Sequence, residues 1–116
     1  MAPDLFISLH HNSTQQTADY NCVSGGLVLY SSPISEGLAA SLAEELWAGI
    51  GAESSVPVRR QSLYVCRQTH CPAVLIEAGY LCNPVEYEKL CKPDNGQRIA
   101  KNIVRGLKNY FITECS

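Results

Sequence analysis

Two short apolar runs, each ending in an ionisable side chain, constrain the fold of this chain more than any other feature. Residues 5–9 (LFISL) lead directly into His10, and residues 73–76 (AVLI) lead into Glu77. Short, nearly continuous apolar runs are typical of strands that are buried on both faces of a sheet. We therefore expect two buried strands that each deliver a polar group to the carboxyl end, where open α/β sheets place their sites.

Helical patterns separate and follow these strands. A helix is predicted after Ser32 and Pro33, because Ser is a favoured cap and Pro fits the first turn. A capping box from Asn83 to Glu86 predicts a short helix that stops before Pro93. Leucine or other apolar residues at helical spacing support the first and the final helix: Leu38, Leu42, Leu46 and then Ile99, Ile103, Leu107, Phe111.

The segments between these elements complete the predicted architecture. Residues 27–30 form a second strand, residues 53–60 are irregular, and residues 63–67 are a strand or an extended segment. Residues 12–21 are polar and form a loop at the same edge as His10. The sequence therefore predicts a single α/β domain with a small, mostly parallel or mixed sheet flanked by helices.

Composition limits the partners of the chain. Its 116 residues allow one domain, and 46% hydrophobic with 17% charged residues is typical of a globular protein. A formal net charge of −2 gives no basic footprint, which argues against a nucleic-acid partner. No apolar run is long enough for a membrane span. The first residues lack the charged region of a signal peptide, so we expect none in this chain.

The six cysteines form no C-x-x-C pair, which gives little support to a zinc ribbon or a thioredoxin-like motif. The even number is compatible with disulfides. Because the chain also has long helical and strand patterns, we expect buried or surface thiols rather than a disulfide framework.

His10 and Glu77 are the candidate reactive pair. If their strands are parallel neighbours in one sheet, the two side chains emerge at the same edge and share a site. They would serve as a metal ligand with a general base, as an acid/base pair without metal, or simply as polar strand ends. The chain has no G-x-S-x-G elbow, phosphate-binding loop or dinucleotide fingerprint.

Four segments of the chain resemble one family, the zinc-dependent N-acetylmuramoyl-L-alanine amidases of the amidase-3 type. Residues 4–12 (DLFISLHHN) are similar to its DLFISIHAN strand. Residues 63–84 (LYVCRQTHCPAVLIEAGYLCNP) are similar to its LYVLRxTxxPAVLVExGFLSNPxE motif almost position for position. Residues 26–30 (GLVLY) and 97–100 (QRIA) resemble further family segments, although Val28 stands where an acidic residue is common.

The resemblance implies roles for individual residues. His10 matches a zinc-binding histidine, and Glu77 matches the catalytic glutamate. The implied substrate is peptidoglycan, cleaved at the amide between N-acetylmuramic acid and L-alanine, in the cell wall or the extracellular or periplasmic space. Asn12 is a candidate for orienting His10 or binding substrate, and Arg67 for meeting a stem-peptide carboxylate.

One departure from the family is large. The family domain begins with a strand ending in Asp-Pro-Gly-His-Gly-Gly, whose His binds zinc, and a Glu ligand follows. Neither is present in this sequence. Catalytic zinc needs about three protein ligands, and nothing in the spacing argues that His11, His70 or Cys71 replaces them.

We therefore interpret residues 1–116 as a partial amidase catalytic domain that lacks the family's N-terminal strands. The chain alone is then expected to be inactive. The alternatives are an inactive relative that binds cell-wall glycopeptide or a protein, and a chain that self-associates through an exposed sheet edge.

Overall fold

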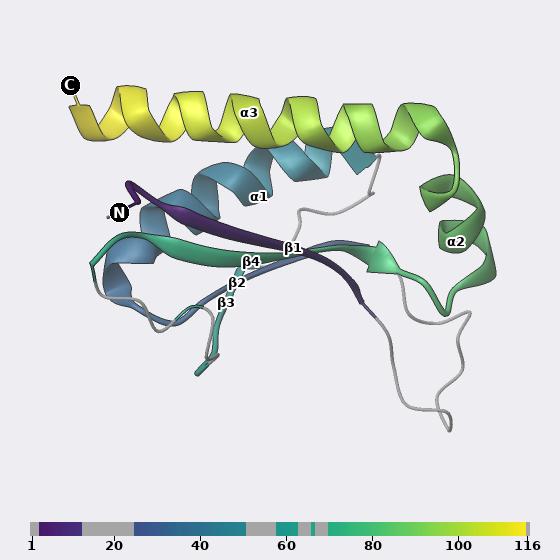
Figure 1. The fold of residues 1–116 in the computed structure, drawn as a ribbon, viewed down its shortest axis with the longest axis horizontal. Coiled ribbons are helices and arrows are strands. Elements are labelled where there is room, and N and C mark those ends of the chain that lie inside the picture. The colour runs from purple at the N-terminus through teal and green to yellow at the C-terminus, as the bar shows by residue number, and fades with distance from the viewer. Residues whose placement is uncertain (1–2, 13–24, 51–57, 63–65, 67–69, 116) are drawn as a thin grey trace.

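A mixed four-stranded sheet, long helices on one of its faces and a short helix at one end make up the fold (Figure 1). The computed structural model describes residues 3–12, 25–50, 58–62, 66 and 70–115. The strands are β1 (Phe6–Asn12), β2 (Leu27–Tyr30), β3 (Val58–Arg60) and β4 (Ala73–Tyr80). The helices are the 3-10 turn η2 (Pro33–Ser35), α1 (Glu36–Ile50), α2 (Pro84–Leu90) and α3 (Pro93–Cys115).

The strands are ordered β1-β4-β2-β3 among the described residues. β1 is parallel to β4, β2 is antiparallel to β4, and β3 is parallel to β2. The predicted single α/β domain with a mixed sheet is therefore confirmed.

The core lies between the sheet and the two long helices, α1 and α3, which Figure 1 shows on the same side of the sheet. Alternate residues of β4 enter it: Val74 and Ile76 are fully buried. Leu38 and Leu42 of α1 belong to the same core cluster and pack on the sheet from the helix side. Gly106 lets α3 approach α1 closely, since a Cβ there would lie 3.1 Å from the Leu42 Cα.

The prediction that residues 5–9 are buried on both faces is wrong. Phe6 is 39% exposed and Leu9 is 52% exposed. The physical reason is position: within the described residues β1 pairs only with β4, and the helices line only one face of the sheet. An apolar run does not distinguish a central strand from an edge strand.

Several local predictions also differ from the structure. Residues 58–60, expected to be irregular, form β3. Ser32 makes no side-chain capping bond, and the turn η2 precedes α1. The predicted strand at 63–67 lies outside the described residues except for Cys66, which is buried, and the polar loop lies outside them from residue 13 on.

Two further properties concern the described residues alone. None of their helices is long and apolar enough to cross a membrane. Their four fully described cysteines, Cys66, Cys71, Cys82 and Cys91, are all free thiols.

Candidate active site

His10 and Glu77 are direct partners in the parallel pairing of β1 with β4. Register partners in parallel strands project from the same face of a sheet. The preceding pair, Leu9 and Ile76, projects toward the helices, because Ile76 belongs to the core. His10 and Glu77 therefore share the face opposite the helices, at the carboxyl ends of both strands.

The Glu77 carboxylate is partly buried and incompletely hydrogen-bonded. Its Oε2 is buried and has no hydrogen-bond partner within the described part of the chain. Burial raises the pKa of Glu77, and the nearby His10 and His11 oppose that shift by Coulombic attraction. An unpaired buried carboxylate oxygen is energetically unfavourable unless a ligand, a metal or water satisfies it. Glu77 is therefore poised to take up a proton or to meet a ligand.

The His10 ring is held from its own strand. Its Nε2 lies 2.7 Å from the Ser8 Oγ, and Ser8 projects from the same strand face two residues earlier. This hydrogen bond orients the imidazole and leaves Nδ1 as the ring nitrogen for a proton or a metal in this rotamer. His10 itself is exposed, so a ligand can reach it.

A bulge follows Glu77 immediately. His10 pairs with Glu77, but Asn12 pairs with Tyr80, so β4 contains one residue more than β1 over this stretch. Gly79 lies in the extra length with a φ of 117°, which a residue with a side chain rarely adopts. This bulge was not predicted, although Gly79, two residues after Glu77, was a signal for it.

The capping box was only half correct. Asn83 caps α2 as predicted, since its side-chain oxygen accepts hydrogen bonds from the backbone N–H groups of Val85 and Glu86. Glu86 does not complete the box. Its Oε1 accepts a hydrogen bond of 2.7 Å from the Gly25 N–H, 61 residues away in sequence. The Asn83 N–H is bonded to the Tyr80 carbonyl oxygen instead.

The other candidate residues differ in how much of them the structure describes. Arg67 lies outside the described residues, and for Asn12 only the backbone, in β1, is described. His11 is exposed and, like His10, acts on Glu77 by Coulombic attraction, so it lies near the site. His70 is exposed and Cys71 is buried, both in the turn that precedes β4.

The donors present fit only part of a zinc site. The described residues contain no group of three or more His, Cys, Asp or Glu side chains placed to hold a metal ion. They offer one oriented imidazole, His10, with the unpaired oxygen of Glu77 beside it. A catalytic zinc ion takes about three protein ligands, so this set would supply one ligand and a base.

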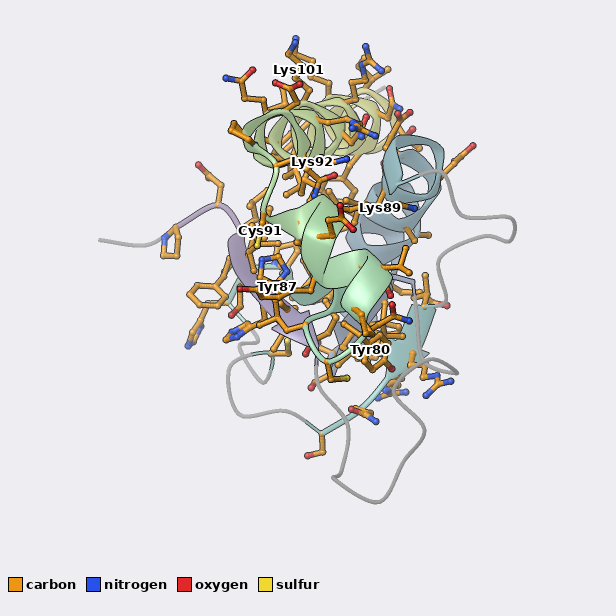
Figure 2. All side chains as sticks on the ribbon, turned by 90° about the vertical axis from the view of Figure 1, so that its right-hand side faces the viewer. Tyr80, Tyr87, Lys89, Cys91, Lys92 and Lys101 are labelled. Atoms are coloured by element: carbon orange, nitrogen blue, oxygen red, sulfur yellow. The ribbon has the colours of Figure 1, made fainter. Side chains whose placement is uncertain are left out.

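The α2 end of the molecule borders the site. The carboxyl ends of β1 and β4 lie at the end of the sheet that α2 adjoins (Figure 1). Figure 2 looks onto this end and shows α2 across it, with Tyr80, the last residue of β4, beside the helix and Tyr87 on it. Contacts between α2 and β4 can therefore act on the strand end that carries Glu77.

Comparisons with known proteins find one family. A family model described as N-acetylmuramoyl-L-alanine amidase matches residues 1–109. Curated relatives named "Probable cell wall amidase LytH" are 34% identical over 110 residues in Staphylococcus epidermidis and 31% identical over 113 residues in Staphylococcus saprophyticus. Each alignment covers 93% of this chain, and the chain spans only 35% of each relative's length.

Solved structures give the same result. The catalytic domain of the amidase CwlV from Paenibacillus polymyxa superposes with a TM-score of 0.81 at 28% identity, over 93% of this chain and 57% of that one. The CwlD amidase from Clostridioides difficile, solved with the GerS lipoprotein, gives a TM-score of 0.83 at 26% identity, over 95% and 55%. The match falls on the C-terminal part of these domains.

Proposed function

Because the chain belongs to the N-acetylmuramoyl-L-alanine amidase family, we propose that it represents a peptidoglycan amidase. The reaction is hydrolysis of the amide bond between N-acetylmuramic acid and L-alanine. The observation that carries the proposal is the register pairing of His10 with Glu77, whose Oε2 is buried without a hydrogen-bond partner among the described residues. The names of the staphylococcal relatives support action at the cell wall, outside the cytoplasmic membrane.

Glu77 is the general base and acid in this proposal. Its Oε2 takes a proton from the attacking water and then gives it to the leaving amine. Burial raises its pKa, which brings the carboxyl closer to the range where one group both accepts and donates a proton near neutral pH.

His10 is the proposed zinc ligand, oriented by Ser8. Zinc, when bound, polarises the scissile carbonyl and lowers the pKa of water. Asn12 and Arg67 remain proposals for contacts to substrate: an amide that orients His10 or the substrate, and a guanidinium that meets a stem-peptide carboxylate.

For the 116-residue chain alone we propose weak zinc affinity and negligible turnover, because its described residues offer no set of three ligands. An inactive relative that binds cell-wall glycopeptide is the alternative function, and the same observation favours it. We also propose that the chain self-associates through the edge of β1 that no described strand pairs with; Phe6 and Leu9 of this strand are exposed.

Zinc titration by calorimetry and release of stem peptide from purified cell wall test these points. The chain alone should bind zinc with a Kd above about 1 μM, weaker than a complete three-ligand site. His10→Ala should remove the binding that exists, and His70→Ala, at an exposed histidine in the turn before β4, is the matched control. Zinc affinity that survives His10→Ala would contradict the ligand assignment.

A chimaera tests the activity itself. The part of the Paenibacillus domain with no counterpart here, about two fifths of it by the 57% coverage, would be fused ahead of residues 1–116. We expect amidase activity that Glu77→Gln lowers by a factor of about 100 or more, as for loss of a general acid/base group. Glu88→Gln, an exposed glutamate on α2, is the control. A folded chimaera that binds glycopeptide without hydrolysing it would favour the alternative.

A further inference from the structure

Glu86 contacts the two backbone positions with the most unusual conformations near the site. Gly25 and Gly79 are the two positive-φ residues of the described chain, at 94° and 117°. Gly25 donates its N–H to the Glu86 Oε1 at 2.7 Å. A Cβ built on Gly79 would lie 2.7 Å from the Glu86 Oε2, so this oxygen occupies the space that a side chain would need.

These two glycines flank Glu77. Gly79 belongs to the bulge that begins directly after Glu77 in β4. Gly25 lies two residues before Leu27. Leu27 of β2 pairs with Glu77 on the side of β4 opposite β1. The Glu86 carboxylate therefore contacts both the residue that precedes β2, Gly25, and the bulge of β4 at Gly79, next to Glu77.

The capping geometry of α2 frees Glu86 for this contact. In an ordinary capping box the third residue of the helix bonds back to the N-cap backbone N–H. Here the Asn83 N–H is bonded to Tyr80, and Asn83 alone caps the helix start with its side chain. The Glu86 side chain is consequently not required to begin α2, and its position reflects the contact with Gly25 and Gly79.

We propose that Glu86 is a positioning residue for Glu77. Its carboxylate braces the β4 bulge against the backbone of Gly25 and thereby fixes the direction in which β4 presents Glu77 beside His10. Bulges redirect side chains next to active sites, and a bulge around a positive-φ glycine keeps its geometry only if its surroundings hold it. The inference rests on the proposed function only in taking Glu77 as the reacting carboxylate.

Backbone NMR of the 116-residue chain, with a chelator and without substrate, tests the proposal independently of zinc and turnover. In Glu86→Ala, exchange of the Gly25 amide should accelerate about tenfold or more, because a hydrogen bond to a charged group is lost. The amide resonances of Glu77 to Tyr80 should shift, and the cross-strand contact between the backbones of Asn12 and Tyr80 should weaken. The α2 amides should keep their protection.

Glu86→Gln keeps an acceptor oxygen and should restore most of the Gly25 protection and of the Glu77 to Tyr80 resonance positions. Exchange of the Gly25 amide should rise only on the order of threefold, because a neutral hydrogen bond is about half as strong. Glu88→Ala, on the same helix and exposed, is the matched control and should change none of these signals. If Glu86→Ala does not fold, Glu86→Gln and Gly79→Ala carry the test. The added Cβ of Gly79→Ala displaces the carboxylate and should release Gly25 in the same way.

Three results would overturn the proposal. Unchanged Gly25 exchange in Glu86→Ala would show that the contact holds nothing. Faster exchange of the Gly25 amide with unchanged Glu77 to Tyr80 resonances would show that Glu86 holds the backbone at Gly25 but does not position Glu77. Loss of protection across α2 would make it an ordinary helix-capping residue. Failure of zinc binding or hydrolysis, in contrast, would count against the proposed function and leave these signals as they are.

Discussion

β1 and β4 are parallel neighbours, paired residue by residue from Phe6–Ala73 to His10–Glu77, but their surroundings differ. β4 has β1 on one side and β2 on the other, and its residues Ala73, Val74 and Ile76 are fully buried. β1 has a neighbour on one side only among the described residues, and Phe6 and Leu9 are substantially exposed. Two strands of similar apolar composition thus belong to different environments.

The difference teaches that neighbours, and not composition, decide how much an apolar strand contributes to stability. Apolar surface stabilises a fold in proportion to the area removed from water, and Leu9 keeps about half of its surface in water. The free edge of β1 also contains no proline and no Lys, Arg, Asp or Glu, the residues that natural edge strands use against unwanted pairing. β1 therefore carries His10 and also has an edge, unpaired among the described residues, with which a further strand could pair.

Truncation of one register pair measures this contrast most directly. Ile76→Ala in β4 should lower the free energy of unfolding by about 2–5 kcal/mol, because it leaves a cavity in the core. Leu9→Ala, its direct partner in β1, should cost less than about 1 kcal/mol, because the side chain is already half exposed. Urea denaturation followed by circular dichroism would measure both variants.

Equal losses for the two variants would break the comparison. A loss of several kcal/mol for Leu9→Ala would mean that β1 is covered in solution, by a second copy or by another segment. A small loss for Ile76→Ala would mean that the core beneath β4 is loosely packed.

The same contrast explains what the sequence could and could not predict. The two apolar runs predicted that His10 and Glu77 share one edge on the condition that their strands are parallel in one sheet, and the pairing of β1 with β4 meets that condition. The exposure of Phe6 and Leu9 could not be read from the run itself, because it depends on which strands lie beside it. The Glu86 contact was hidden for a similar reason: its partner, Gly25, is distant in sequence, and the local pattern favoured a capping box.

Self-association tests whether the edge of β1 that no described strand pairs with is available to a second copy of the chain. Sedimentation velocity should show a concentration-dependent increase in mass for the unmodified chain. Leu9→Lys should weaken the association by about tenfold or more, because a lysine on an edge strand must be desolvated when another strand pairs with it. Val85→Lys, at a 62% exposed valine on α2, is the matched control and should leave the association unchanged. A monomer at every concentration would contradict pairing through β1.

The smallest expected effect concerns the ionisable pair of the two strands, His10 and Glu77. Burial raises the pKa of Glu77 in the folded chain, His10 and His11 oppose the shift, and the unfolded value is about 4.3. The folded state therefore binds the Glu77 proton more tightly. The contribution of Glu77 to the free energy of unfolding is fully present below the unfolded pKa and is lost as pH rises through the folded pKa. Glu77→Gln cannot ionise and should not show this decline.

Urea denaturation in chelator between about pH 3.5 and 7, around the ordinary carboxyl pKa, would measure this difference. Relative to the unmodified chain, Glu77→Gln should gain stability as pH rises, by less than about 1 kcal/mol, because the carboxylate is only partly buried and two histidines lie near it. Glu88→Gln, at an exposed carboxylate, should follow the unmodified chain throughout. If Glu77→Gln instead lost stability toward neutral pH, attraction to His10 and His11 would outweigh burial. The burial of β4 would then not decide how its glutamate titrates.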